Sequence, residues 1–151
     1  MSKERFKLTT AINLLLRRDN QILLLKRNNT GNQDGMYSII AGHLEQGELG
    51  TTAIAREARE EAGITIEPAD IKFVHLVQRL PKDDTQEEYL DIFYEAWVWQ
   101  GEPSNNEPEK CSELVWCKVD DLPDTTIPLL PIVINDISNG INYSEYSEEP
   151  V

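Results

Sequence analysis

The chain has 151 residues and a formal net charge of −13, from 14 Lys and Arg against 27 Asp and Glu. A chain of this length holds one domain, so we expect a single domain over residues 1–151, with its core at about 8–138 and a polar tail at 139–151 that frays. The negative charge disfavours nucleic-acid polymers and anionic membranes as partners, and it repels a phosphate ligand unless a cation lies between protein and ligand.

The first two apolar runs predict a β-hairpin. Residues 8–17 and 21–27 are rich in Leu and Ile, and the turn formers Asp19 and Asn20 separate them. Residues 28–36, "NNTGNQDGM", follow directly, and Asn, Gly and Asp dominate that stretch. These residue types favour turns, so we expect a loop there.

The middle of the chain alternates between strand and helix patterns. Residues 37–42 predict a short strand, and the helix formers of 49–62 predict a helix that Gly63 ends. Residues 71–80 and 88–100 are then two long runs of aromatic and β-branched side chains, which favour strands. A polar stretch joins these two runs.

The last part of the chain predicts one more strand and one more helix. Residues 113–119 favour a strand, and residues 120–138 contain the last helix, although Pro128 and Pro131 restrict where it begins. The predicted order is therefore two strands, a loop, a strand, a helix, two strands, a strand and a helix. This order favours an α+β fold, an α/β/α sandwich in which a mixed sheet packs between helices.

The cysteines and the N-terminal residues indicate no disulfide framework and no secretion signal. Cys111 and Cys117 are six residues apart without a CxxC pattern, so we expect buried, reduced thiols. The stretch "MSKERFKL" has no apolar region, and the apolar runs are far too short to span a membrane. We therefore expect a cytoplasmic protein.

Three glutamates of the 49–62 helix lie against the local electrostatics. Glu57, Glu60 and Glu61 are spaced i, i+3 and i+4, so they crowd into one arc of the helix surface, and two of them lie in the last turn, where the helix dipole disfavours anions. Support from Arg56 at i,i+4 is worth only a few tenths of a kcal/mol. A solvated acidic face is the structural alternative, but a bound divalent cation explains the placement better. Oxygen ligands without His or Cys favour Mg²⁺ or Mn²⁺.

The spacing around these glutamates resembles a known signature. Gly42, five residues, Glu48, seven residues and then residues 56–64, "REAREEAGI", match the Nudix box at every fixed polar and glycine position. The strand ending "LLLKR" and the segment "WCKVDDLP" are also similar to this family, so the resemblance covers roughly residues 8–135. It implies the Nudix fold and hydrolysis of a phosphoanhydride bond in a nucleoside diphosphate that is linked to another group.

The resemblance also implies roles for individual residues. The carbonyl of Ala41 is a further metal ligand, and Gly42 allows the loop to leave the strand. Arg56 orients the carboxylates by pairing with one of them, and Glu48 pairs with or supports this cluster. Three side chains bind the metal, which is Mg²⁺ with Mn²⁺ as the alternative: Glu57, Glu60 and Glu61.

One further loop glutamate is expected to join the site. Family members often recruit such a residue after the long strands, and the spacing of Glu107 from "GEP" is similar to that in mutator-type nucleoside triphosphate pyrophosphohydrolases. We favour Glu107 over Glu109 and Glu113, with a solvated loop acid as the alternative. Either this residue or one of the box glutamates activates the water.

For the remaining polar and aromatic candidates, an ordinary structural role is an alternative to a functional one. His43 either contacts phosphate or is an exposed loop residue, while His75, within an apolar strand, favours a satisfied core histidine. Three tryptophans offer stacking surfaces, although their apolar strands favour burial in the core: Trp97, Trp99 and Trp116.

We expect an enzyme that acts on a small-molecule nucleotide. The leading hypothesis is Mg²⁺-dependent hydrolysis of a nucleoside triphosphate to nucleoside monophosphate and pyrophosphate. Cleavage of ADP-ribose or another nucleoside diphosphate sugar is the close alternative, because Pro81 lies near a proline position of ADP-ribose-cleaving relatives. A non-catalytic nucleotide or metal sensor and a structural acidic domain also stay open. Pairing of long strands would allow a homodimer.

Overall fold

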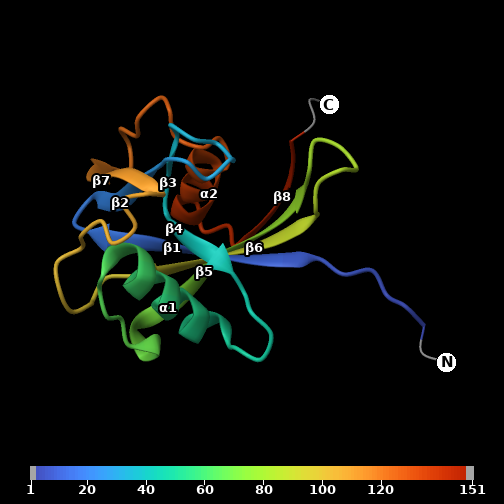
Figure 1. Cartoon of the computed structure of the whole chain (residues 1–151), viewed down its shortest axis with the longest axis horizontal. Helices are drawn as coiled ribbons and strands as arrows, with labels where there is room; N and C mark the ends of the chain where they lie inside the picture. The colour runs from blue at the N-terminus through green and yellow to red at the C-terminus, as the bar shows by residue number, and fades with distance from the viewer. Residues whose placement is uncertain (1–2, 149–151) are drawn as a thin grey trace.

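A computed structural model describes residues 3–148. An eight-stranded mixed sheet lies between two helices, α1 (Gly50–Ala62) and α2 (Leu129–Ser138), as Figure 1 shows. This arrangement confirms the predicted α/β/α sandwich. The strands are β1 (Thr9–Arg18), β2 (Gln21–Arg27), β3 (Tyr37–Ser38), β4 (Ile40–His43), β5 (Ile71–Leu80), β6 (Tyr89–Ala96), β7 (Cys111–Lys118) and β8 (Tyr143–Ser147), with a short 3₁₀ helix at Pro68–Asp70.

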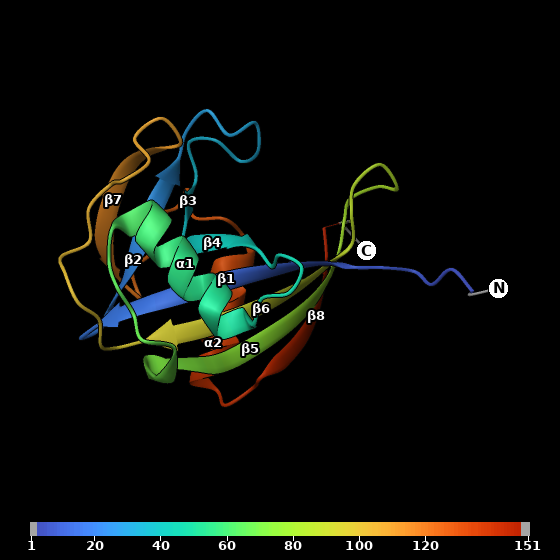
Figure 2. The same ribbon diagram turned by 60° about the horizontal axis from the view of Figure 1, so that its bottom comes forward.

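The sheet divides where β1 and β2 diverge from each other beyond their turn. The main strand order is β3-β2-β1-β6-β5-β8, with β4 pairing with β1 and β7 pairing with β2. β1 and β2 pair only beside their turn, at Arg17 with Ile22 and at Arg18 with Gln21. Beyond that point β1 continues between β4 and the parallel β6, whereas β2 continues beside β7. The divergence of the two strands is visible in Figure 2.

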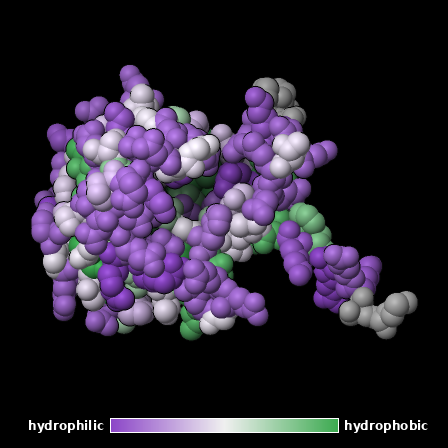
Figure 3. Space-filling model, viewed as in Figure 1, coloured by the Kyte–Doolittle hydropathy of each residue, from purple (hydrophilic) through white to green (hydrophobic). Residues whose placement is uncertain are grey.

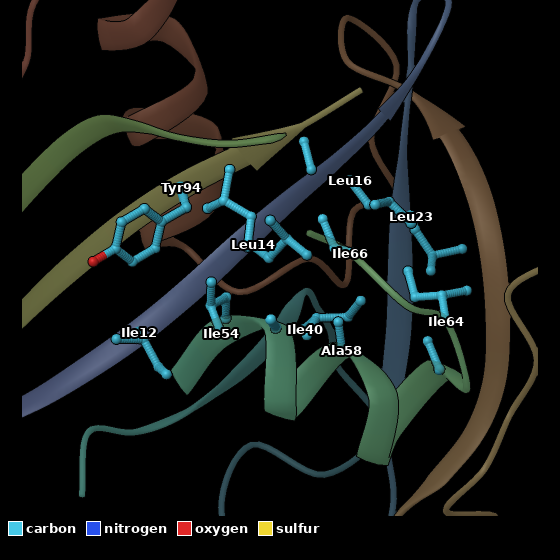
Figure 4. Packing of buried hydrophobic residues seen from close by; sticks show 14 of the residues in the cluster. Ile12, Leu14, Leu16, Leu23, Ile40, Ile54, Ala58, Ile64, Ile66 and Tyr94 are labelled. Atoms are coloured by element: carbon cyan, nitrogen blue, oxygen red, sulfur yellow. The ribbon is translucent and has the colours of Figure 1, made fainter. Parts of the chain in front are cut away.

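The two faces of the sheet bury separate cores because side chains alternate along a strand. On β1, Ile12, Leu14 and Leu16 point toward α1 and pack with residues such as Ile54, as Figure 4 shows. Leu15, on the opposite face, belongs to the core that packs against α2. Full burial of one such aliphatic side chain contributes about 1.5–3 kcal/mol, so β1 is anchored from both sides.

The sequence of α1 fits a helix that lies close to the sheet. Its buried face is mostly alanine, and small side chains allow a near approach of helix and strands. Gly63 ends the helix at φ 68°, a left-handed conformation that glycine adopts without strain, and its N–H donates to the carbonyl of Arg59. The predicted helix end is therefore confirmed.

Three segments differ from the sequence prediction. The tail after residue 138 was expected to fray, but residues 143–147 form β8, which pairs in parallel with β5. Residues 149–151 lie outside the described part. The last helix begins at Leu129, because prolines restrict the chain just before it and in its first turn. The second long strand run, expected at 88–100, ends as a strand at Ala96.

The surface is mainly hydrophilic. Figure 3 shows one face that polar side chains dominate and that is hollowed near its middle. Residues 3–7 are exposed and extend away from the sandwich. Within residues 3–148, no helix has the length and apolar character needed to cross a membrane.

Candidate active site

A hollow of about 1500 Å³ opens beside the sheet and collects the predicted site residues other than Glu48. Strands β1, β2, β4, β5 and β6 contribute to its lining, together with the start of α2 and several loops. The depression near the middle of Figure 3 gives a view of this side of the molecule. Four carboxylates from α1 and from the loop before β7 line it: Glu57, Glu60, Glu61 and Glu107.

Close contact between β4 and α1 brings two of these carboxylates to the backbone. The N–H of Ala41 donates to Glu61 Oε2 at 3.2 Å. A Cβ atom on Gly42 would overlap with the Glu57 carboxylate, so the strand approaches the helix as closely as a glycine permits. The backbone of residues 41–42 therefore lies directly beside the carboxylates that the sequence predicted as ligands.

Arg56 is the hub of the carboxylate cluster. Its Nη2 lies 2.8 Å from Glu48 Oε1, and its Nη1 lies 2.8 Å from Glu57 Oε1. The same Nη1 lies 3.4 Å from Glu60 Oε2. Arg56 thus pairs with Glu48, and its hydrogen bond lowers the pKa of the Glu48 carboxyl. The hydrogen bond to Glu48 also raises the pKa of Arg56.

The cluster still holds more negative charge than Arg56 balances. Burial raises the pKa of Glu61 to about 8, and the neighbouring charges of Glu57 and Glu107 act in the same direction. Burial also raises the pKa of Glu57, even though Arg56 opposes that shift. Buried acids beside one another favour the proton-bound form unless a cation compensates.

This cluster fits a hard divalent cation. The available donors are carboxylate and backbone carbonyl oxygens, which are the ligands that Mg²⁺ and Mn²⁺ prefer. Among the residues that the structure describes, no three acidic, His or Cys side chains are already gathered closely enough to hold a metal. Arg56 contacts one oxygen of Glu57 and one oxygen of Glu60, so the arginine leaves the second oxygen of each carboxylate for a cation.

Of the three loop acids considered from the sequence, Glu107 is the one that lines the hollow. The loop is fixed to the end of α1, because the N–H of Asn106 donates to the carbonyl of Glu61 at 3.2 Å. Glu109 is exposed outside the hollow. Glu113 accepts a hydrogen bond from the Tyr37 hydroxyl at 2.7 Å. The preference for Glu107 thus agrees with its position.

A second charged group lines the hollow at β5 and β6, and the sequence reading did not identify it. Arg79 donates to both carboxylate oxygens of Asp91, at 2.7 and 3.2 Å, and lies 4.2 Å from the centre of the Tyr89 ring. Asp91 is 4% exposed. Burial alone would lower the pKa of Arg79, but its hydrogen bond to Asp91 raises it above the ordinary value. The sequence signal that could have revealed this pair is one charged residue within each of two largely apolar strand segments, Arg79 in 71–80 and Asp91 in 88–100.

The two histidines have different surroundings. His43 is exposed at the rim of the hollow, and its ring centre lies 5.8 Å from that of Tyr89. His75 is fully buried, with Nδ1 at 3.0 Å from the carbonyl of Ile141 and Nε2 at 2.8 Å from the Ser144 hydroxyl. The prediction of a satisfied core histidine is confirmed for His75.

The tryptophans lie away from the hollow. Trp99 and Trp116 stack with ring centres 5.9 Å apart and are partly buried, in line with the structural alternative. Trp97 is 54% exposed, so its expected burial was wrong: the strand ends at Ala96 and the chain turns outward. Cys111 is buried and Cys117 partly buried, and both are free thiols, as predicted.

The sequence matches known proteins over most of its length. The model of the NUDIX domain matches residues 7–134. An 8-oxo-dGTP diphosphatase from Escherichia coli (strain K12) is 26% identical over 129 residues, which cover 82% of this chain and 94% of that protein. An NAD-capped RNA hydrolase NudC from Escherichia coli O1:K1 / APEC is 32% identical over 123 residues, which cover 80% of this chain but only 44% of that longer protein.

Solved structures give the same result for the fold. A MutT NUDIX hydrolase from Burkholderia pseudomallei superposes with a TM-score of 0.77 at 27% identity, covering 86% of this chain and 98% of that one. A MutT protein from Bacillus halodurans superposes with a TM-score of 0.74 at 22% identity, covering 95% and 92%. The second likeness concerns the fold alone.

Proposed function

The chain belongs to the NUDIX domain family and is a Nudix-type pyrophosphohydrolase, and from this premise we propose that it hydrolyses a nucleoside triphosphate to nucleoside monophosphate and pyrophosphate. One observation carries the proposal: a carboxylate cluster with surplus negative charge lies in a hollow that also gathers cations. Six of the chain's 14 Lys and Arg residues line this hollow, although the chain is acidic overall. An anionic ligand with a divalent cation matches both features.

The proposed metal ligands are the carboxylates of Glu57, Glu60 and Glu61 with the carbonyl of Ala41. A bound Mg²⁺, or Mn²⁺ in its place, would neutralise phosphate oxygens and lower the pKa of a bound water. Arg56 aims the carboxylates, since it contacts Glu57 and Glu60 and is itself held by Glu48. Gly42 lets the strand come close enough for this arrangement.

The other proposed roles concern the phosphates and the attacking water. Lys26, Arg27 and Lys110 line the hollow beside the 28–36 loop and can contact phosphate oxygens. Water adds to a phosphorus atom, the bond from that phosphorus to the leaving phosphate oxygen breaks, and a carboxylate accepts the water's proton. Glu61 and Glu107 are the candidates for this proton acceptor, because each lines the hollow.

A nucleoside diphosphate linked to another group, such as ADP-ribose, is the second candidate substrate. The hollow supports it because the lining continues beyond the carboxylates to Arg79, Tyr89 and Tyr146, which leaves room for a second group. The relative at 32% identity bears the name NAD-capped RNA hydrolase, and NAD is itself a nucleoside diphosphate linked to another group. Product analysis separates this substrate class from the triphosphates.

The test is release of phosphate or pyrophosphate from a panel of nucleoside triphosphates and diphosphate sugars with and without Mg²⁺. Wild type is compared with Glu61→Gln and with Glu67→Gln, a matched control at an exposed position outside the hollow. We expect metal-dependent turnover that Glu61→Gln lowers on the order of 10²–10³-fold and Glu67→Gln preserves. Nucleotide binding without turnover of any panel member would instead support a non-catalytic sensor, and the absence of metal-dependent stabilisation would support a structural acidic domain.

A further inference from the structure

The strand β8 lies outside the family match yet forms part of the hollow. The match ends at residue 134, whereas β8 begins at Tyr143. Tyr146 and Glu148 of this last segment both line the hollow. Parallel pairing with β5 holds the segment in place, and the N–H of Glu148 donates to the carbonyl of Leu80 at 3.2 Å. One wall of the hollow therefore comes from a segment that the family pattern does not specify.

Strand register places three side chains that line the hollow, one from each of β6, β5 and β8, in one row. Arg79 of β5 is the register partner of Tyr89 in β6 and of Tyr146 in β8. Residues directly opposite one another in adjacent strands point to the same face of the sheet. All three side chains line the hollow, so the Arg79 guanidinium has Tyr89 on one side and Tyr146 on the other.

The charged side chains that line the hollow around β8 include more carboxylates than cations. Arg79 is already committed, since it donates twice to Asp91 and its Nη1 donates to Glu148 Oε1 at 3.3 Å. The nearby loop adds Lys82 and Glu87, whose charges balance each other. One arginine therefore faces two carboxylates. Because the Glu148 side chain is 34% exposed, it is accessible to a ligand in the hollow.

We propose that Tyr146 and Glu148 determine substrate specificity by receiving the ring at the non-phosphate end of the substrate. The inference rests on the proposed function and adds the chemical class of that ring: a planar nitrogen heterocycle with adjacent N–H donors on its edge. Glu148 accepts the N–H hydrogen bonds, because an ionised carboxylate offers acceptors only. Arg79 is a positioning residue that holds Glu148 and covers the Tyr89 ring, and Tyr146 packs against the substrate ring.

The test measures binding, so it does not depend on turnover. Calorimetry with Mg²⁺ compares methylene-bridged analogues of GTP and ITP, which differ by one amino group on the ring, with inorganic triphosphate, which has no ring. Glu148→Gln should weaken the GTP analogue about tenfold, the loss of one charge-assisted hydrogen bond, and the ITP analogue less. The affinity for inorganic triphosphate should stay unchanged.

Glu145→Gln is the matched control, since Glu145 lies on the same strand, carries the same charge and is exposed outside the hollow. Tyr146→Ala provides a second variant, which should weaken both nucleotide analogues and leave inorganic triphosphate unaffected. Equal effects of Glu148→Gln and Glu145→Gln, or equal weakening of ringed and ringless ligands, would overturn the proposal. Melting temperatures of the variants identify any loss caused by unfolding.

The two proposals fail in different ways. Metal-dependent hydrolysis whose base preference is the same in wild type and Glu148→Gln would overturn the specificity role and leave the proposed function intact. Absence of hydrolysis in wild type would overturn the proposed function, while the binding comparison would still decide the specificity role.

Discussion

Two arginine-centred clusters line the same hollow, and they differ in their charge balance. Arg56 lies within 4 Å of four carboxylates, those of Glu45, Glu48, Glu57 and Glu60. Arg79 contacts two, Asp91 and Glu148. Both arginines are partly buried, with 26% and 21% of their side chains exposed.

The difference separates a cluster that needs a cation from an ion pair, Arg79 with Asp91, that is already satisfied. Around Arg56 the surplus of acid is large enough that burial and its neighbours raise the pKa of Glu61 to about 8. Around Arg79 the buried Asp91 has both oxygens bound, so its charge is compensated within the protein. The compensated Arg79–Asp91 pair therefore indicates structure, whereas the surplus acid around Arg56 and the additional carboxylate of Glu148 beside Arg79 indicate ligands.

Removing one carboxylate from the unbalanced cluster should give the largest effect. For Glu61→Gln we expect the Mg²⁺-dependent rate to fall on the order of 10²–10³-fold, because a metal ligand and a charge beside the phosphates are lost. Thermal stability should be retained, since a strained buried acid is replaced by a neutral amide. Initial rates with the best panel substrate check the first expectation, and a rate within twofold of wild type would contradict it.

The balanced pair of Arg79 and Asp91 should respond mainly in stability. Arg79→Met leaves Asp91 buried without its partner, and breaking such a pair costs about 3 kcal/mol of unfolding free energy. Urea unfolding measures this loss. The double variant Arg79→Met/Asp91→Leu serves as the control, because removing both charges should recover most of the stability. An unchanged midpoint in the single variant would show that the pair contributes nothing.

The orientation of the Glu57 and Glu60 carboxylates should depend on the planar guanidinium of Arg56. Arg56→Lys keeps the charge but cannot hold Glu48 and Glu57 through separate guanidinium nitrogens, so we expect a 10- to 100-fold loss of activity, in the range typical for residues that orient metal ligands. Arg59→Lys, at an exposed position of the same helix, is the control and should retain activity. Similar losses in both variants would argue against a role specific to Arg56.

The pH dependence of metal-free stability reports the same imbalance without a substitution. The folded chain holds the Glu61 proton more tightly than the unfolded chain, because the pKa rises from 4.5 to about 8. This contribution is complete below pH 4.5 and is lost as pH rises toward about 8. Stabilisation by Mg²⁺ should increase over the same window, since the cation replaces the proton.

Unfolding of wild type and Glu61→Gln at pH 5.5, 7 and 8.5, with and without Mg²⁺, measures this effect. The stability of metal-free wild type should fall relative to Glu61→Gln as pH rises. Parallel pH profiles in the two proteins would sink the assignment of this titration to Glu61.

The sequence predicted the elements whose signals are local. Apolar runs separated by turn-forming residues located β1 and β2, and Gly63 located the end of α1, because a positive φ at a helix end is a property of single residues. The spacing of Glu57, Glu60 and Glu61 likewise follows from the pitch of one helix. These features need no information about distant parts of the chain.

The rest depends on contacts between distant segments. Arg79 and Asp91 belong to different strands, and only the register between β5 and β6 brings them together. Strand β8 is polar, so its pairing with β5 is not visible in hydrophobic periodicity. The exposure of Trp97 follows from the end of β6, a boundary that β propensity does not define. The homodimer stays a prediction.

The parallel pairing of β1 with β6 has a consequence for folding. Thr9 pairs with Tyr89, 80 residues further along the chain, and fully buried side chains of β1 depend on that pairing. Closing so long a loop is slow, and on the ribosome it cannot begin until β6 has been synthesised. Leu15, whose core partners include Phe93 of β6 and Leu130 of α2, therefore lacks part of its native cover while most of the domain is made. The interval before β6 appears is when the nascent chain is most prone to aggregate.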